Sequence, residues 1–238
     1  MQLLVSVADA REARAARLGG ADVIDAKNPR RGALGAVSDP TLRAIRAAAG
    51  HPFSAALGDE GGTAILARRT RVAAQLGATY VKVGFRDIRT TAGVRARAVA
   101  VLGATVARPG TRVVLVAYAD WSRAGSPAPA VVVEVAAATG AAGVLLDTAY
   151  KDAALLALWS PEIVGAWVAA VQRAELFAAV AGSLTARDVP LVRELGADLV
   201  GVRGAACVGG RLGRVTRARV AVLSALARGS APLRAALA

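Results

Sequence analysis

The stretch GGADVIDAK at residues 19–27 recurs in varied form at three later points of the chain. The related stretches are LGATYVKVG at 76–84, TGAAGVLLD at 139–147 and LGADLVGVRG at 195–204. In each of them Gly-Ala follows an amphipathic pattern rich in Ala, Leu and Arg, and a short apolar run comes next. A glycine at this position is typical of a helix C-cap, and an almost continuous apolar run is typical of a parallel strand buried on both faces. The repeated stretch therefore predicts a βα unit.

Counting such units along the chain gives eight strands, each followed by a helical pattern. The predicted strands cover residues 2–6, 22–26, 53–57, 79–84, 112–118, 142–147, 176–181 and 198–203. Eight units in 238 residues predict an α/β protein that is a single (β/α)8 TIM barrel. An open doubly wound sheet would use some of the same segments, but the first βα turn, SVADAREA, lacks the GxGxxG fingerprint. We expect one catalytic domain over 1–238, with a frayed or docked tail at 230–238.

The composition indicates a soluble chain that uses neither a metal nor a disulfide. Hydrophobic residues make up 55% of it, but charges such as Glu134 interrupt every long apolar run, so we expect no membrane partner. Cys207 is the only cysteine and His51 the only histidine, which leaves the usual His/Cys ligand set of a metal site incomplete. We therefore expect a cytoplasmic protein without a metal ion.

The formal charge of +13 raises the alternative of nucleic-acid binding, because clustered Lys and Arg displace counterions from a phosphate backbone. The arginines are spread along the predicted helix faces, however, and no ladder of aromatic residues accompanies them. We expect no nucleic-acid partner. The positive charge is better suited to attracting small dianionic substrates.

The scarcity of lysine points to the chemistry of the site. Of the 30 Lys and Arg residues only Lys27, Lys82 and Lys151 are lysines. Lys27 and Lys151 follow predicted strands and Lys82 lies near the end of another, so all three should lie at the C-terminal mouth, where barrel active sites form. Arginine can supply a plain positive charge, whereas only lysine can lose its proton and act as an amine. The alternative is that all three form ion pairs on the rim.

Two carboxylates accompany these lysines. Asp25 and Lys27 are two residues apart on one strand, so their side chains leave the same face and can form a pair. Asp147 ends another strand just ahead of Lys151. Ammonium groups that share a small buried space repel one another, so we expect at least one lysine pKa to be lowered. The resulting neutral amine can attack an aldehyde or ketone and form an iminium that acidifies the adjacent carbon.

Phosphate contacts are expected in the loops after the seventh and eighth strands, where barrels often bind phosphate through backbone N–H groups. The small residues Gly182, Gly201 and Gly204 permit close approach of the backbone. Ser183 adds a hydroxyl, and Arg203 adds a bidentate guanidinium donor. Ser183 and Thr185 could instead cap a helix, with Thr185 and Asp188 at the spacing of a capping box. Tyr118 and Asp120 end the fifth strand and either line the site or pack beside it.

These stretches resemble the (5-formylfuran-3-yl)methyl phosphate synthase family of methanofuran biosynthesis. The resemblance spans nearly the whole chain and is carried by MQLLVSVADA at 1–10, GGADVIDAKNPRRGALGA at 19–36, YVKVGF at 80–85, AYAD at 117–120, LLDTAYKD at 145–152, AGSL at 181–184 and DLVGVRGAAC at 198–207. It implies a lyase that joins two molecules of glyceraldehyde 3-phosphate into a furan without a metal or an organic cofactor.

The same resemblance implies a role for each candidate residue. Lys27 would form the Schiff base, Lys82 would accept the proton, and Asp25, Asp147 and Lys151 would assist proton transfer and dehydration. The expected partner is a small phosphorylated aldehyde, and we expect the subunits to form a homo-oligomer. The nearest alternative is another Schiff-base aldolase that acts reversibly on sugar phosphates.

Overall fold

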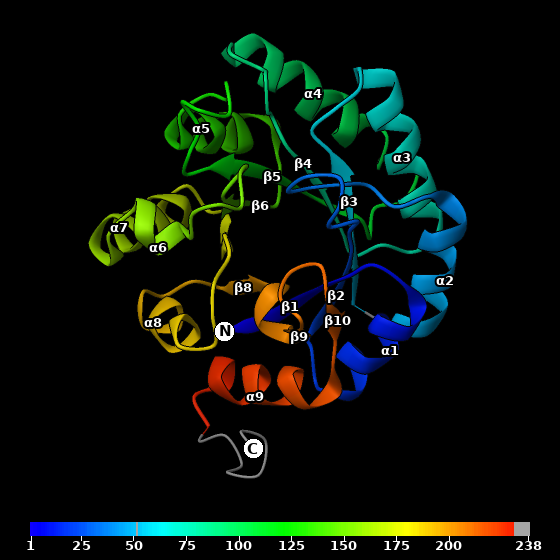
Figure 1. Cartoon of the computed structure of the whole chain (residues 1–238). Helices are drawn as coiled ribbons and strands as arrows, with labels where there is room; N and C mark the ends of the chain where they lie inside the picture. The colour runs from blue at the N-terminus through cyan, green and yellow to red at the C-terminus, as the bar shows by residue number, and fades with distance from the viewer. Residues whose placement is uncertain (51, 231–238) are drawn as a thin grey trace.

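The computed structural model describes residues 1–50 and 52–230 and forms a closed barrel of parallel strands in sequence order (Figure 1). Each strand pairs with the next, and β1 pairs with β8 to close the ring. The eight strands are β1 (Gln2–Val7), β2 (Val23–Ala26), β3 (Phe53–Gly58), β4 (Tyr80–Val83), β5 (Arg112–Tyr118), β6 (Gly143–Asp147), β7 (Phe177–Val180) and β8 (Leu199–Val202). The prediction of a single (β/α)8 barrel is confirmed. His51 and positions 231–238 of the expected tail lie outside the described residues.

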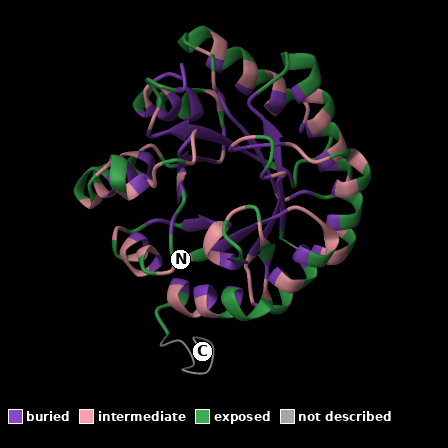
Figure 2. Ribbon diagram, in the orientation of Figure 1, coloured by how far each residue is buried: buried purple, intermediate pink, exposed green. Residues whose placement is uncertain are grey.

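Helices surround the barrel and expose their outer faces (Figure 2). They are α1 (Ala10–Leu18), α2 (Asp39–Ala49), α3 (Thr63–Gln75), α4 (Thr91–Gly103), α5 (Pro129–Thr139), α6 (Leu155–Leu158), α7 (Pro161–Arg173), α8 (Asp188–Glu194) and α9 (Arg217–Arg228). No helix in the described part of the chain has both the length and the apolar character that crossing a membrane requires.

The repeated Gly-Ala stretch ends four of these helices in the same way. Gly20, Gly77, Gly140 and Gly196 all have φ between 76° and 86°, in the left-handed region that favours glycine. The alanine after each glycine donates its N–H to the carbonyl five residues back, as in Ala21 N–H to Ala16 O at 3.1 Å. This is the 6→1 bond of a Schellman motif. The motif turns the chain into the next strand, which explains why the Gly-Ala stretch predicts the start of these strands.

Three short elements between β8 and α9 were not predicted. A short 3₁₀ helix, η1 (Gly204–Ala206), leads into a two-stranded hairpin of β9 (Cys207–Val208) and β10 (Arg214–Val215). β10 packs against α1, and Arg211 in the hairpin loop donates to the carbonyls of Pro29 and Gly32, which follow β2. The hairpin loop thereby contributes to the wall of the candidate site.

Candidate active site

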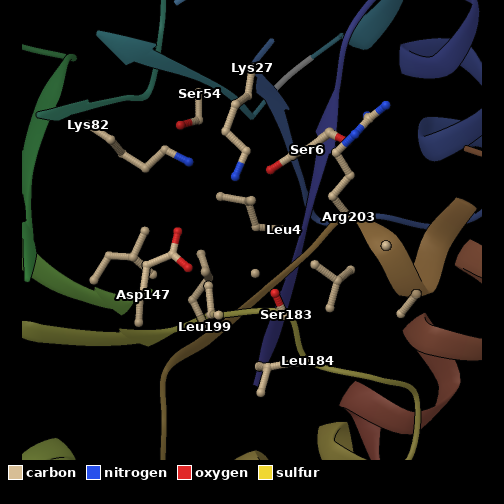
Figure 3. Close-up of a pocket in the computed structure, with 18 of the residues that line it drawn as sticks. Leu4, Ser6, Lys27, Ser54, Lys82, Asp147, Ser183, Leu184, Leu199 and Arg203 are labelled. Carbon is tan, nitrogen blue, oxygen red and sulfur yellow. The ribbon is translucent and has the colours of Figure 1, made fainter. Parts of the chain in front are cut away.

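A cavity of about 410 Å³ opens at the C-terminal ends of the strands (Figure 3). Most of the residues predicted for the site line it: Lys27, Lys82, Asp147, Lys151, Gly182, Ser183, Gly201, Arg203 and Gly204. In Figure 3 the amines of Lys27 and Lys82 point into the space that Asp147 faces from the other side. The barrel therefore brings three lysines and a carboxylate from three separate strands to one place.

Asp25 pairs with Lys82 and not with its strand neighbour Lys27. The Lys82 Nζ to Asp25 Oδ2 distance is 2.7 Å, and both side chains are almost fully buried. Ser6 Oγ donates to the same oxygen at 2.9 Å. Burial raises the pKa of Asp25, but the ammonium groups of Lys82 and Lys27 and these hydrogen bonds outweigh it, so the pKa lies below its usual range. The predicted pairing of Asp25 with Lys27 is wrong, and Asp25 instead holds the Lys82 amine in place.

Lys27 is the amine without a fixed partner. Its side chain is 9% exposed, and within the described residues it makes no hydrogen bond or ion pair. Burial lowers its pKa to about 7, the nearby Asp147 carboxylate opposes this, and Lys82 and Lys151 lower it further. The expectation that one lysine pKa is lowered by burial and by neighbouring amines is met at Lys27. About half of such amines are neutral near pH 7 and can act as nucleophiles.

Asp147 and Lys151 form the second buried pair. Lys151 Nζ lies 2.6 Å from Asp147 Oδ1 and donates a longer hydrogen bond to Thr148 Oγ1. Asp147 also accepts the backbone N–H of Thr148 at 2.8 Å. Burial raises the pKa of Asp147, and the ammonium groups of Lys151 and Lys27 more than offset it, so the net pKa is lowered. A second pair of an acid and an amine thus lies near enough to Lys27 to affect its pKa.

The loop after β7 has a backbone suited to an anion. Ser183 has φ 54°, which is uncommon outside glycine, and Gly182 before it has φ 109°. Within the described residues neither the N–H nor the hydroxyl of Ser183 has a hydrogen-bond partner. Thr185 and Asp188 form half of the expected capping box, because the Asp188 carboxylate accepts the Thr185 N–H at 2.7 Å. Ser183 is therefore free to face the cavity.

Arg203 does not offer its guanidinium to a ligand. It forms a buried ion pair with Glu12 at 2.8 Å. Its remaining N–H groups donate to the carbonyls of Ser6, Arg211 and Gly213. With every donor engaged, Arg203 fastens the β9–β10 hairpin to α1 and β1. The expectation of a bidentate phosphate donor at Arg203 is wrong for this arrangement, although the residue borders the cavity.

Tyr118 and Asp120 pack beside the site and do not line the cavity. The Tyr118 hydroxyl donates to buried Asp59. Burial raises the pKa of Asp59, and it raises the pKa of Tyr118 well above the usual value. Asp120 accepts the backbone N–H groups of Ala149 and Tyr150 at 2.7 and 2.9 Å, and so shapes the loop that carries Lys151. Of the two alternatives for these residues, packing beside the site is the one observed.

Residues 3–224 of the chain match the model of the 4-HFC-P synthase family. The chain belongs to this family. The (5-formylfuran-3-yl)methyl phosphate synthase of Methanocaldococcus jannaschii is 38% identical over 237 residues, which covers 96% of this chain and 100% of the relative. The protein of the same name from Methanopyrus kandleri is 41% identical over 218 residues and covers 87% and 89%. The resemblance recognised in the sequence is thereby confirmed, and the chain is an enzyme of this synthase family.

Solved structures outside the synthase family share the barrel. The N-(5'-phosphoribosyl)anthranilate isomerase of Pyrococcus furiosus superposes with a TM-score of 0.64 at 14% identity, covering 96% of this chain and 99% of the other. The 3-hexulose-6-phosphate synthase of Salmonella typhimurium gives 0.61 at 19% identity, with the same coverage. At such low identity these similarities show the fold alone.

Sequence reasoning missed several lining residues of this 4-HFC-P synthase family member. Ser6 and Ser54 lie inside strands and were not singled out as site residues, and only their inward register reveals them. Arg211 and Arg219 belong to a basic stretch whose placement depends on the unpredicted hairpin. Arg211 donates to the carbonyls of Pro29 and Gly32, whereas the exposed Arg219 side chain has no partner among the described residues. Arg219 is therefore the better candidate for a substrate phosphate.

Proposed function

We propose that this chain condenses two molecules of glyceraldehyde 3-phosphate into (5-formylfuran-3-yl)methyl phosphate through a Schiff base on Lys27, in methanofuran-type biosynthesis. The observation that carries the proposal is the buried Lys27 amine, which has a pKa of about 7 and stands unpaired between two ion pairs. The relatives that share most of the chain's length bear the name of this synthase. The reaction is a lyase reaction that needs no cofactor in this scheme.

The first stage is formation of the iminium. Neutral Lys27 attacks the aldehyde carbon of one triose, and the resulting carbinolamine loses water when its hydroxyl receives a proton. The Lys82 ammonium, held by Asp25 at 2.7 Å, is the donor in this scheme. Lys82 is then neutral and can remove the proton from the carbon next to the iminium, which gives an enamine.

The second stage joins the two trioses. The enamine carbon attacks the aldehyde of the second molecule, and loss of one phosphate and of water completes the ring. In this scheme Lys151 protonates a departing oxygen. The Asp147 Oδ1 atom lies 2.6 Å from Lys151 Nζ and takes part in returning a proton to that amine. Backbone N–H groups at Ser183 and Gly204, with Arg219 at the start of α9, would bind the phosphates.

Product analysis tests the proposal. Pure protein incubated with glyceraldehyde 3-phosphate should form a product that absorbs in the near ultraviolet, with one inorganic phosphate released for each furan phosphate. The Lys27→Arg variant keeps the charge, cannot form the iminium, and should be inactive while folding normally. A product that returns to trioses on dilution would indicate a reversible aldolase and would refute the proposal.

A further inference from the structure

The cavity continues below the lysines into an apolar layer of the barrel. Side chains two residues apart on a strand share a face, so each residue two positions before a polar residue of the mouth lies one layer deeper. Leu4 precedes Ser6 in this way, Tyr80 precedes Lys82, and Leu145 precedes Asp147. All three deeper residues line the cavity, and Figure 3 shows Leu4 and Leu199 among the side chains that surround it.

Small residues on β7 and β8 keep this layer open. Barrel interiors are usually filled by layers of bulky branched side chains, but Ala179 and Gly201 occupy two inward positions here. A Cβ on Gly201 would lie 3.2 Å from Ala181 Cβ, which is a tight contact, and 3.7 Å from Leu4 Cδ2, which is an ordinary one. A methyl group here would therefore fill space between these side chains. Gly201 was expected to bind phosphate, yet it lies inside β8, a layer below the phosphate loop. A glycine at position 201 is explained by the space that the missing side chain leaves open in the barrel interior.

This layer has few hydrogen-bonding groups for a ligand. Two hydroxyl groups line the deeper part: the Tyr80 oxygen accepts an N–H of Arg112 at 2.9 Å, and the Ser54 hydroxyl has no partner within the described residues. A triose phosphate carries an oxygen on every carbon, so several of them would be left unpaired here, which is costly. A furan ring has a single ring oxygen and apolar faces. It could pack against Leu and Ala side chains and the edge-to-face pair of Tyr80 and Phe177.

We propose that this layer, lined by Leu4, Leu145, Ala179, Leu199 and Gly201, is the binding subsite for the furan ring. The subsite rests on the proposed function and adds to it the part of the site that recognises the product. The ring would lie below Lys27, with its phosphomethyl group directed to the Ser183 loop. Apolar burial of the ring then favours the dehydrated product over its hydroxylated precursors.

Comparing two phosphate esters distinguishes binding of the furan ring from binding of the phosphate group. Furan-3-ylmethyl phosphate has the ring but no aldehyde, so it cannot react with Lys27, and glycerol 3-phosphate has a polar chain in place of the ring. Binding of each is measured by calorimetry, without turnover. We expect the native protein to bind the furan ester more tightly. Gly201→Ala and, separately, Ala179→Val should weaken the furan ester about tenfold or more, as one methyl group does in a close-fitting apolar pocket, and leave glycerol 3-phosphate unchanged.

Gly103→Ala is the matched control, because a Cβ at this exposed helical position meets no atom within 4 Å. It should bind both esters as the native protein does. Equal native affinity for the two esters, or an equal loss of both in the variants, would refute the subsite. Failure to form the furan phosphate from glyceraldehyde 3-phosphate would count against the proposed function alone, because the binding comparison does not depend on catalysis.

Discussion

The reactivity of Lys27 should change with pH near neutrality. Its pKa is lowered from 10.5 to about 7 by burial, by Lys82 and by Lys151, against the opposing effect of Asp147 and Asp25. At pH 7 about half of the Lys27 side chains are then neutral, against roughly 3 in 10,000 for a lysine with the ordinary pKa. The lowered pKa therefore increases the supply of nucleophile by roughly 1,500-fold.

Two substitutions should move the Lys27 midpoint in opposite directions. Asp147→Asn removes a carboxylate that favours the charged amine, so it should lower the Lys27 pKa further below 7. Lys151→Met removes a like charge and also frees Asp147 to favour the ammonium form, so it should raise the Lys27 pKa. The opposite signs separate these electrostatic effects from a general loosening of the site.

Trace labelling with acetic anhydride provides the assay, since only neutral amines react. Mass spectrometry of digests labelled between pH 5.5 and 9.5 reports each lysine separately, and the chain has only three. Lys27 should be half-maximally reactive near pH 7 in the native protein. A midpoint near 10, or shifts of the same sign in both variants, would refute the reasoning.

Three further predictions concern stability and phosphate binding. Arg203→Ala should cost about 3–5 kcal/mol of unfolding free energy, because it leaves Glu12 buried without its partner, and removing Glu12 as well should recover part of the loss in chemical denaturation. Lys27→Met should stabilise the fold below pH 7 by up to ~5 kcal/mol, because the pKa of Lys27 is lower in the folded chain than in the unfolded chain. The free-energy cost of burying the Lys27 ammonium is complete below about pH 7 and disappears as the pH rises to 10.5. Arg219→Ala should raise KM for the triose phosphate roughly tenfold with little change in kcat, whereas Arg217→Ala, exposed on the same turn but outside the cavity, should change neither. Unchanged stability in the first two variants, or unchanged KM in the third, would contradict these assignments.

The fold could be predicted from the sequence because the local turn signals and the hydrophobic pattern of the strands indicate the same structure. The Gly-Ala stretch encodes a Schellman turn that only glycine accommodates easily, and the apolar run after it can only be a strand buried on both faces. The position of the lysines followed for the same reason. Once the strands are known, Lys27, Lys82 and Lys151 must reach the C-terminal mouth.

The pairing of the charges could not be predicted in the same way. Asp25 aligns with Ser54 on β3, and Ser54 aligns with Tyr80 on β4, so the long Lys82 side chain can reach Asp25 past a small residue. That contact depends on the register of three strands, which the sequence alone does not reveal. The misassignment of Arg203 has a similar cause, since its acceptors lie on α1, β1 and a short hairpin with no periodic pattern.

The role of Lys27 as the Schiff-base residue is tested by identifying the lysine that carries the substrate. Native protein is mixed with glyceraldehyde 3-phosphate and sodium borohydride, digested, and analysed by mass spectrometry. We expect a reduced adduct on Lys27 alone, lost in Lys27→Arg and retained in Lys82→Arg, where the charge is preserved but the proton acceptor is removed. An adduct on Lys82 or Lys151 with Lys27 unmodified would contradict this role of Lys27.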